Sequence, residues 1–145
     1  MSLPRREDFK QFIKMPVRWG DMDSLGHVNN AKFFTYDESG RLAYFEQLAR
    51  DDQKFFKEYG LILASISCDF LMQLHYPAEL DIGTRVARIG RSSMNTQAAM
   101  FNGDKLVAVV RGVVVWFDYV AQQALPVPGH IREWIRSREV VAPEE

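Results

Sequence analysis

Residues 20–30 hold the densest group of chemically capable side chains in the sequence. The segment reads Gly-Asp-Met-Asp-Ser-Leu-Gly-His-Val-Asn-Asn. A carboxylate can attack a carbonyl carbon or activate a water molecule, and an imidazole can transfer a proton. Because the segment separates an alternating apolar stretch from a long apolar and aromatic one, we interpret it as a strand-to-helix junction that carries an active site.

The position of Asp23, just before the predicted start of a helix, suggests a specific chemistry. Backbone N–H groups at a helix start are free and carry partial positive charge, so they can polarise an acyl or thioester carbonyl and stabilise the oxyanion that forms. A thiolate is already a good leaving group at neutral pH. A carboxylate and a helix N-terminus are therefore a sufficient minimal set for thioester hydrolysis, without a Ser-His-Asp arrangement.

Structural roles compete with this interpretation. Aspartate beside glycine commonly stabilises a turn or caps a helix, which applies to Asp21 and Asp23. A lone histidine such as His27 is more often structural than catalytic, and Asn29 and Asn30 can cap the helix that follows them. Asp21, Asp23 and His27 match no common zinc spacing. We expect no metal and no cofactor.

The hydrophobic pattern predicts the elements that would position the junction. Residues 12–19 alternate as in a half-buried strand, and residues 30–50 repeat at intervals of three and four as in a helix of roughly 30 Å. The N-terminal strand is followed by that helix and four more strands. These later elements are a short helix at 51–59, strands at 61–74, 79–88, 92–101 and 105–117, and a short amphipathic helix at 129–138.

Two of these strands carry further expectations. The strand at 105–117 is nearly all apolar, so we expect it to be central and covered on both faces, and a strand this apolar in a small chain also suggests a partner chain. The strand at 61–74 is expected to have one dry face, made by Ile62, Ala64, Ile66, Cys68, Phe70, Met72 and Leu74.

The order of elements indicates an α+β fold, in which a curved antiparallel sheet of about five strands wraps around one long central helix. Such a sheet leaves at least one unpaired edge. We divide the chain into a flexible N-terminal segment (residues 1–10), a single domain (residues 11–140) and a polar tail (residues 141–145).

Composition excludes several classes of protein. The 145 residues, 47% of them apolar, suit one domain with a real core. The net charge of -1 gives no reason to expect nucleic acid or a membrane surface as a partner, and no apolar run reaches the length of about 18 residues needed for a membrane span. The single cysteine, Cys68, excludes an internal disulfide. The N-terminus has no secretory signal pattern, so we expect a cytoplasmic protein.

The junction from Trp19 to Asn30 and the helix residues that follow it resemble a known family. The resemblance is to the hotdog-fold acyl-CoA thioesterases, within them to the 4-hydroxybenzoyl-CoA thioesterase-like branch, and it spans nearly the whole chain. It implies the hotdog fold and the hydrolysis of an acyl-CoA to free acid and CoA, with the acyl chain unspecified. We expect a homodimer or homotetramer. The helix residues that carry the resemblance are Phe34, Tyr36, Glu38, Arg41 and Phe45.

Residue by residue, the resemblance implies that Asp23 is the catalytic carboxylate, acting as nucleophile or general base, with Asp21 in support. It also implies that the backbone N–H of Asn30 polarises the thioester carbonyl. His27 matches a histidine of the related plant acyl-carrier-protein thioesterases. Their asparagine two residues after the aspartate is replaced here by Leu25.

One further carboxylate, Glu38, lies on the predicted helix, where another hotdog branch has a catalytic glutamate. We expect Glu38 to be structural and to pair with Arg41, three residues later.

Arg88, Arg91, Ser92 and Ser93 lie in a basic turn between two predicted strands. A guanidinium group can donate two parallel hydrogen bonds to a phosphate, although most such turns are simply solvated. The resemblance implies that this turn contacts the nucleotide or pantetheine part of CoA, commonly across the dimer. The main alternative function is a non-catalytic acyl-CoA binding or sensing protein on the same fold, and a hotdog hydratase is a third.

Overall fold

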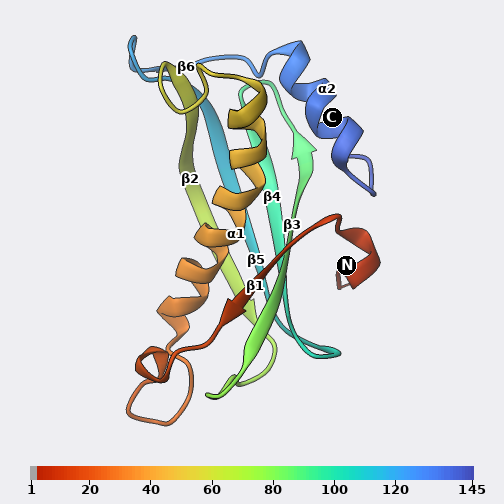
Figure 1. Cartoon of the computed structure of the whole chain (residues 1–145). Coiled ribbons are helices and arrows are strands. Elements are labelled where there is room, and N and C mark those ends of the chain that lie inside the picture. Colours follow the sequence, from red (N-terminus) through yellow and green to blue (C-terminus); the bar gives the residue numbers. More distant parts are fainter. Residues whose placement is uncertain (1–2) are drawn as a thin grey trace.

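The computed structural model describes residues 3–145, so residues 1 and 2 of the predicted flexible segment lie outside the described part of the chain. A long helix lies against a curved sheet, with a short second helix at one end (Figure 1). In chain order the elements are η1 (Arg6–Asp8), β1 (Gln11–Pro16), η2 (Trp19–Asp21), α1 (Asn30–Asp51), β2 (Tyr59–Phe70), β3 (Glu79–Ile89), β4 (Ser93–Asn102), β5 (Lys105–Asp118), β6 (Gln123–Ala124) and α2 (Gly129–Arg138).

The sheet is antiparallel and runs in the order β1-β3-β4-β5-β2, with β6 pairing with β5. It curves around α1, as the order of elements predicted (Figure 1). The boundaries of α1, β3, β4, β5 and α2 fall within one residue of the predicted ones. Within the described sheet, β2 is an end strand, with β5 as its one neighbour.

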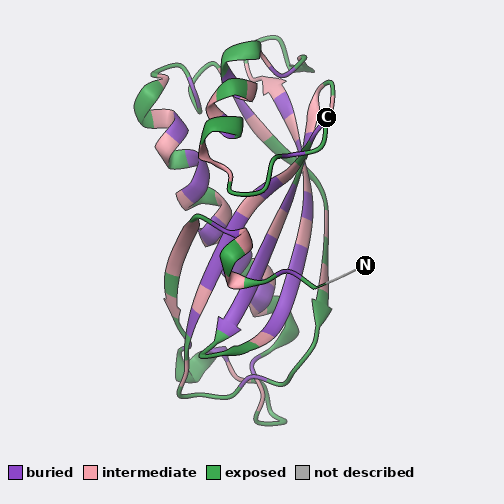
Figure 2. Cartoon of the chain, turned by 90° about the vertical axis from the view of Figure 1, so that its right-hand side faces the viewer, coloured by how far each residue is buried: buried purple, intermediate pink, exposed green. Residues whose placement is uncertain are grey.

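The core has two parts, one under each half of α1. Phe33 and Tyr36, near the N-terminal end of α1, pack with the sheet in the first part. Tyr44, Phe45 and Leu48, toward the C-terminal end of α1, pack with the sheet and with α2 in the second part. Between the two parts α1 crosses β3 closely at Gly40, where an added Cβ would lie 2.8 Å from Thr84 Oγ1. Buried residues alternate with less buried ones along the strands (Figure 2).

The predicted strand over 12–19 extends too far. β1 ends at Pro16, which lacks a backbone N–H for the ladder, and residues 19–21 form η2. Trp19, the last residue of the predicted half-buried strand, is 74% exposed.

The short helix predicted over 51–59 is also wrong, because the residues after Asp51 form turns. The side chain of Asp52 accepts a hydrogen bond from Lys54 N at 3.1 Å and one from the Tyr59 hydroxyl. Bonds of this kind from an aspartate to nearby backbone favour a turn over a helix.

A bulge in β2 overturns the predicted dry face of that strand. The register with β5 shifts between Leu63 and Ser65, so Ala64 is an extra residue in the ladder. One extra residue moves the side chains that follow it to the opposite face. Ile66 and Cys68 therefore pack against the core, whereas Ile62 and Ala64 are exposed.

The prediction for the apolar strand β5 is confirmed over one half only. Residues 107–110 are buried on both faces, but Arg111, Val113 and Val115 on the face away from α1 are only half-buried. The N-terminal segment covers the lower part of this face, because Phe9 packs against Ala99 and Phe101. The C-terminal tail lies beside β3, where Ile89 N donates to Glu144 O at 2.8 Å.

No helix in residues 3–145 is both long enough and apolar enough to cross a membrane.

Candidate active site

Asp21 anchors the junction to α1. Its side chain is 2% exposed and accepts hydrogen bonds from the Tyr36 hydroxyl at 2.7 Å and from Arg18 N at 3.0 Å. Burial opposes the charged form, but these bonds and the Arg18 guanidinium together hold the pKa of the Asp21 carboxyl below its usual range. Its backbone oxygen also accepts from Asn29 N at 3.0 Å. All of these contacts are structural.

Asp23 heads a tight loop and remains exposed. Asp23 N donates to His27 O at 2.8 Å, and Gly26, whose φ of 84° favours glycine, donates its N–H to Asp23 O at 3.2 Å. One carboxylate oxygen of Asp23, Oδ1, accepts from Leu25 N at 2.9 Å and from His27 N at 3.4 Å. The loop thus orients the carboxylate through one oxygen and leaves Oδ2 without a hydrogen-bond donor among residues 3–145.

A second loop, after β2, packs against the first. Val28 N donates to Leu74 O at 2.8 Å, and His75 Nδ1 lies 2.9 Å from Gly26 O. The rings of His75 and His27 meet edge to face, with centroids 5.1 Å apart. Sequence reasoning missed His75, and no motif or spacing could have found it, because the contact depends on two loops 49 residues apart.

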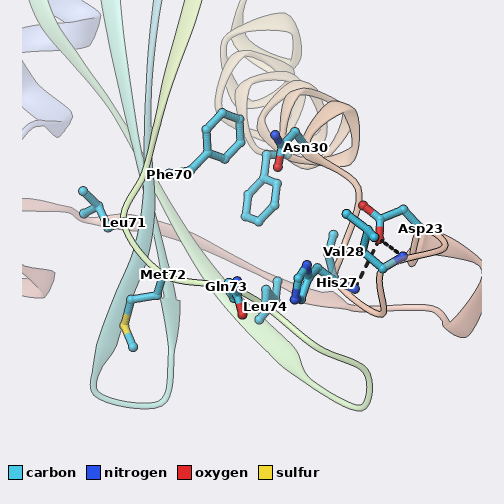
Figure 3. Close-up of a pocket in the computed structure, with 11 residues that line it drawn as sticks. Asp23, His27, Val28, Asn30, Phe70, Leu71, Met72, Gln73 and Leu74 are labelled. Carbon is cyan, nitrogen blue, oxygen red and sulfur yellow. Dashed lines mark hydrogen bonds between the residues drawn. The ribbon is translucent and has the colours of Figure 1, made fainter.

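The two loops and the start of α1 line a cleft of about 360 Å³ that is open to solvent. Figure 3 shows Asp23, His27 and Asn30 around it, opposite the chain from Phe70 to Leu74. The structure thus brings the three residues predicted to be catalytic into one cleft. Its apolar wall includes Phe33, Phe70, Met72 and Leu74.

The start of α1 supplies a free hydrogen-bond donor at this cleft. Asn29 is the N-cap, and its side chain accepts from Ala31 N at 3.0 Å, which settles which asparagine caps the helix. Lys32 N donates to Asn29 O at 2.9 Å. Asn30 is the first helical residue, so its N–H has no acceptor within the helix. Asn30 lines the cleft, so the positive end of the α1 dipole lies at its edge.

The residues predicted to bind the carrier lie elsewhere in the chain. The turn between β3 and β4 is at the α2 end of the sheet, whereas the junction is at the opposite end (Figure 1). Arg91 is exposed there, and the backbone oxygens of Arg91 and Ser92 accept from Val127 N and Trp116 N at 2.8 and 2.7 Å. A single chain therefore does not bring Arg88, Arg91, Ser92 and Ser93 to the cleft.

The predicted Glu38–Arg41 pair is wrong. Arg41 Nη1 donates instead to Asp37 Oδ2 at 2.6 Å, one helical turn before it, while Glu38 is exposed. Asp37 is buried, and burial raises the pKa of its carboxyl to about 6, although Arg41 opposes the rise. Spacings of three and four residues both bring side chains together on a helix, so sequence alone could not choose between the two carboxylates.

Residues 3–145 contain no group of three or more His, Cys, Asp or Glu side chains arranged to hold a metal ion. The polar residues that line the cleft are Asp23, His27, Asn30 and Gln73.

A sequence model of the thioesterase-like superfamily matches residues 17–135. The chain is 34% identical over 89 residues to the uncharacterized protein YsmA of Bacillus subtilis, a match that covers 61% of this chain and 59% of YsmA. It is 23% identical over 125 residues to the chloroplastic acyl-acyl carrier protein thioesterase ATL2 of Arabidopsis thaliana, over 84% of this chain and 66% of ATL2. The chain thus spans less than two thirds of the length of either relative.

The fold is also similar to that of a solved protein. The crystal structure of a Thermus thermophilus thioesterase, complexed with coenzyme A and Zn, superposes with a TM-score of 0.81. The two chains are 32% identical, and the match covers 92% of this chain and 96% of that one.

Proposed function

The chain belongs to the thioesterase-like superfamily, and from this membership we propose that it hydrolyses an acyl-CoA to a free acid and CoA. Membership in this superfamily confirms two predictions from the sequence: the resemblance to the hotdog-fold thioesterases and the hotdog fold itself. The CoA carrier is supported by the related Thermus thermophilus thioesterase, which is complexed with coenzyme A.

One observation carries the proposal: Asp23 and Asn30, the first residue of α1, line the same cleft. With the thioester carbonyl oxygen at Asn30 N, its carbon is polarised for attack. As general base, Asp23 takes a proton from a water molecule, whose oxygen bonds to that carbon. The oxyanion that results is stabilised by the Asn30 N–H and the helix dipole. Collapse of the intermediate breaks the C–S bond and releases CoA as a thiolate.

Direct attack is the second route. Here Oδ2 of Asp23, the oxygen without a donor from the loop, bonds to the carbonyl carbon and displaces the thiolate, giving an acyl-aspartyl anhydride that water then hydrolyses. In single-turnover hydrolysis in ¹⁸O-labelled water, ¹⁸O in Asp23 identifies direct attack followed by hydrolysis of the anhydride at the aspartyl carbonyl. Water attack at the acyl carbonyl of the anhydride would label the product acid instead, as the general-base route does.

His27 is the second side chain with proton-transfer chemistry in the cleft. It has no side-chain hydrogen bond to the carboxylate of Asp23 among the described residues; instead its backbone N–H bonds Asp23 Oδ1. We assign it a supporting role, as a proton donor to the departing thiolate or as a wall of the site.

A homodimer would complete the carrier end of the site. The outer side of β2 has unpaired backbone groups in the described sheet, and Ile62, Leu63 and Phe70 are exposed on this strand. Such an edge is a template for pairing with another strand. Antiparallel pairing of two β2 strands would place the α2 end of one subunit beside the cleft of the other. The turn with Arg88, Arg91, Ser92 and Ser93 would then approach the partner's cleft.

The dimer is tested by sizing chromatography with light scattering at micromolar concentration. A charge pair on the edge, Ile62→Lys with Leu63→Glu, is expected to shift wild-type dimer or tetramer toward monomer. A monomeric wild-type protein would contradict this part of the proposal.

The hydrolysis is tested with Asp23→Asn and Asp23→Ala on a panel of aryl- and fatty acyl-CoA esters, by release of free thiol. We expect kcat to fall by roughly 10²–10⁴-fold, the usual contribution of a positioned acid or base. Asp104→Asn, at an exposed aspartate in the β4–β5 hairpin, is the matched control and should keep wild-type kcat. A folded Asp23→Asn protein with wild-type turnover would remove Asp23 from the mechanism.

Acyl-CoA binding without hydrolysis is the alternative function. It predicts that the wild-type protein binds acyl-CoA tightly in calorimetry and releases no thiol from any ester in the panel.

A further inference from the structure

A second and larger depression lies on the other face of the sheet. The side chains of Ile82, Ala98 and Val110 point to the core beneath α1, and side chains of a strand alternate between faces. On β3, Arg85 lies between Thr84 and Val86, which face α1, so its side chain points away from α1. We call this depression the outer groove. It measures about 770 Å³ and is lined by Ser65, Ser67, Arg85, Ala87, Arg88, Asn95, Thr96, Gln97, Arg111, Gly112, Val113, Val141, Ala142 and Glu144.

The floor of the outer groove is a row of polar side chains in register across four strands. Arg85 on β3 is opposite Gln97 on β4, Gln97 is opposite Arg111 on β5, and Arg111 is opposite Ser67 on β2. Neighbouring strands are about 4.8 Å apart, so the Cα atoms of Arg85 and Arg111 are about 10 Å apart, with Gln97 between them.

The three arginines of the outer groove keep most of their hydrogen-bonding capacity. Arg85 Nε donates to Gln97 Oε1 at 2.8 Å, and Arg111 Nη1 donates to Asp69 Oδ2 at 2.7 Å. Each guanidinium group has five N–H donors, so several remain on both. Arg88 is exposed and has no side-chain hydrogen bond or ion pair within residues 3–145. Glu144 is the one acidic residue among the lining residues described.

We propose that the outer groove binds the diphosphate of a nucleotide. The two phosphates of a diphosphate are bridged by one oxygen, so Arg85 and Arg111 can each direct a guanidinium fork at one of them, and such charge-assisted pairs are strong. Arg88, beside this row, can contact the same anion. The volume of the groove also accommodates more than a diphosphate, because sites for small molecules typically span about 300–1,000 Å³.

The charge distribution disfavours a second copy of the chain as the occupant. Stacking two outer faces about a two-fold axis would place arginines near arginines, and like charges in contact cost free energy. The lining also lacks the large apolar side chains expected of a protein interface core.

Two sources can supply this chemistry: the carrier end of the substrate or a free nucleotide. The first rests on the proposed function and extends the carrier site from Arg88 to Arg85 and Arg111, whereas the second does not depend on it. The diphosphate is shared by both.

The test is isothermal titration calorimetry of the full chain with ADP, CoA and adenosine. We expect ADP and CoA to bind and adenosine, which has no phosphate, not to bind. Arg85→Gln with Arg111→Gln should weaken ADP binding at least tenfold. Arg50→Gln, at an exposed arginine near the end of α1, is the matched control and should leave binding unchanged. The three arginines are at the surface, and thermal melting checks that each variant is folded.

Kinetics with an acyl-CoA separates the two sources. A tenfold rise of KM at unchanged kcat in the double variant identifies the substrate's carrier, whereas unchanged KM with lost ADP binding identifies a free nucleotide. Failure of both ADP and CoA to bind, or binding that the double variant retains in full, would overturn the proposal. Binding that Arg91→Gln abolishes and the double variant keeps would move the site to the β3–β4 turn. A catalytically inactive protein that still binds ADP through the outer groove would contradict the proposed function alone.

Discussion

The two ends of α1 differ in the state of their polar groups. At its C-terminal end the Tyr44 hydroxyl donates to Glu139 Oε2 at 2.6 Å, and Val86 N donates to the same oxygen at 2.7 Å. Burial raises the pKa of the Glu139 carboxyl, although both bonds and the charge of Arg85 oppose the rise, and its partners Tyr44 and Val86 belong to the apolar core. At its N-terminal end Asp23 is exposed and the Asn30 N–H has no acceptor within the helix.

This difference shows where polar groups serve stability and where they remain available. A buried polar group without partners costs free energy, so the C-terminal end supplies partners to those it buries. At the N-terminal end Asp21 is buried and paired with Tyr36, but Asp23 is exposed and open to a ligand. Substitutions at the C-terminal end should therefore reduce stability, and substitutions at the N-terminal end should reduce turnover.

The largest effect on stability is expected at Phe45. This side chain is 1% exposed, and its ring packs 4.9 Å from that of Tyr44 and 6.4 Å from that of Phe55. Phe45→Ala should lower the free energy of unfolding by about 3–5 kcal/mol, measured by urea denaturation. Leu42→Ala, at a 47% exposed position on the same helix, should cost less than about 1 kcal/mol. If folded Phe45→Ala loses as much turnover as Asp23→Asn, the two ends are not separable.

The pH dependence of stability tests the middle of α1. Burial raises the pKa of the Asp37 carboxyl to about 6 in the folded protein, whereas an unfolded aspartate loses its proton near its ordinary pKa of 3.8. The folded state is therefore favoured below pH 4, and this contribution is lost as pH rises from about 4 to about 6. Between these limits the wild-type protein should lose roughly 1–3 kcal/mol of unfolding free energy relative to Asp37→Asn. Parallel pH profiles of the two proteins would contradict the assignment.

A smaller effect is expected from the hydroxyl of Tyr44. Tyr44→Phe removes one donor from the half-buried Glu139 carboxylate, so it should cost about 1–2 kcal/mol of unfolding free energy, again by urea denaturation. Tyr76→Phe, at an exposed tyrosine, is the control and should stay near wild type. Equal stability of both variants would mean that the Glu139 network does not support this end.

Asp23→Asn is expected to change stability the least, although it is expected to lower turnover the most. In Asp23→Asn the amide oxygen can still accept from Leu25 N and His27 N, so the loop keeps its bonds. The free energy of unfolding should therefore change by less than about 0.5 kcal/mol, the usual range for surface substitutions. A loss of several kcal/mol would show that Asp23 is mainly structural.

Much of the fold could be predicted because its signals are local. The apolar repeat of α1 and the alternation of β1 each depend on residues within one element. Two predictions of secondary structure failed where a local hydrogen bond or one extra residue overrides the hydrophobic pattern. The Asp52 turn replaced a short helix, and the bulge at Ala64 reversed the faces of β2.

For the candidate site, the sequence determined the chemical groups and their order: a carboxylate, an imidazole and the start of a helix within residues 20–30. These are local facts, set by spacing along the chain. The tertiary structure decided which of the two aspartates is open, because Tyr36, fifteen residues away, bonds Asp21. It also brought His75 to Gly26 and aligned Arg85 with Arg111 across two strand pairings. Such contacts depend on the register of distant segments, which no local pattern fixes.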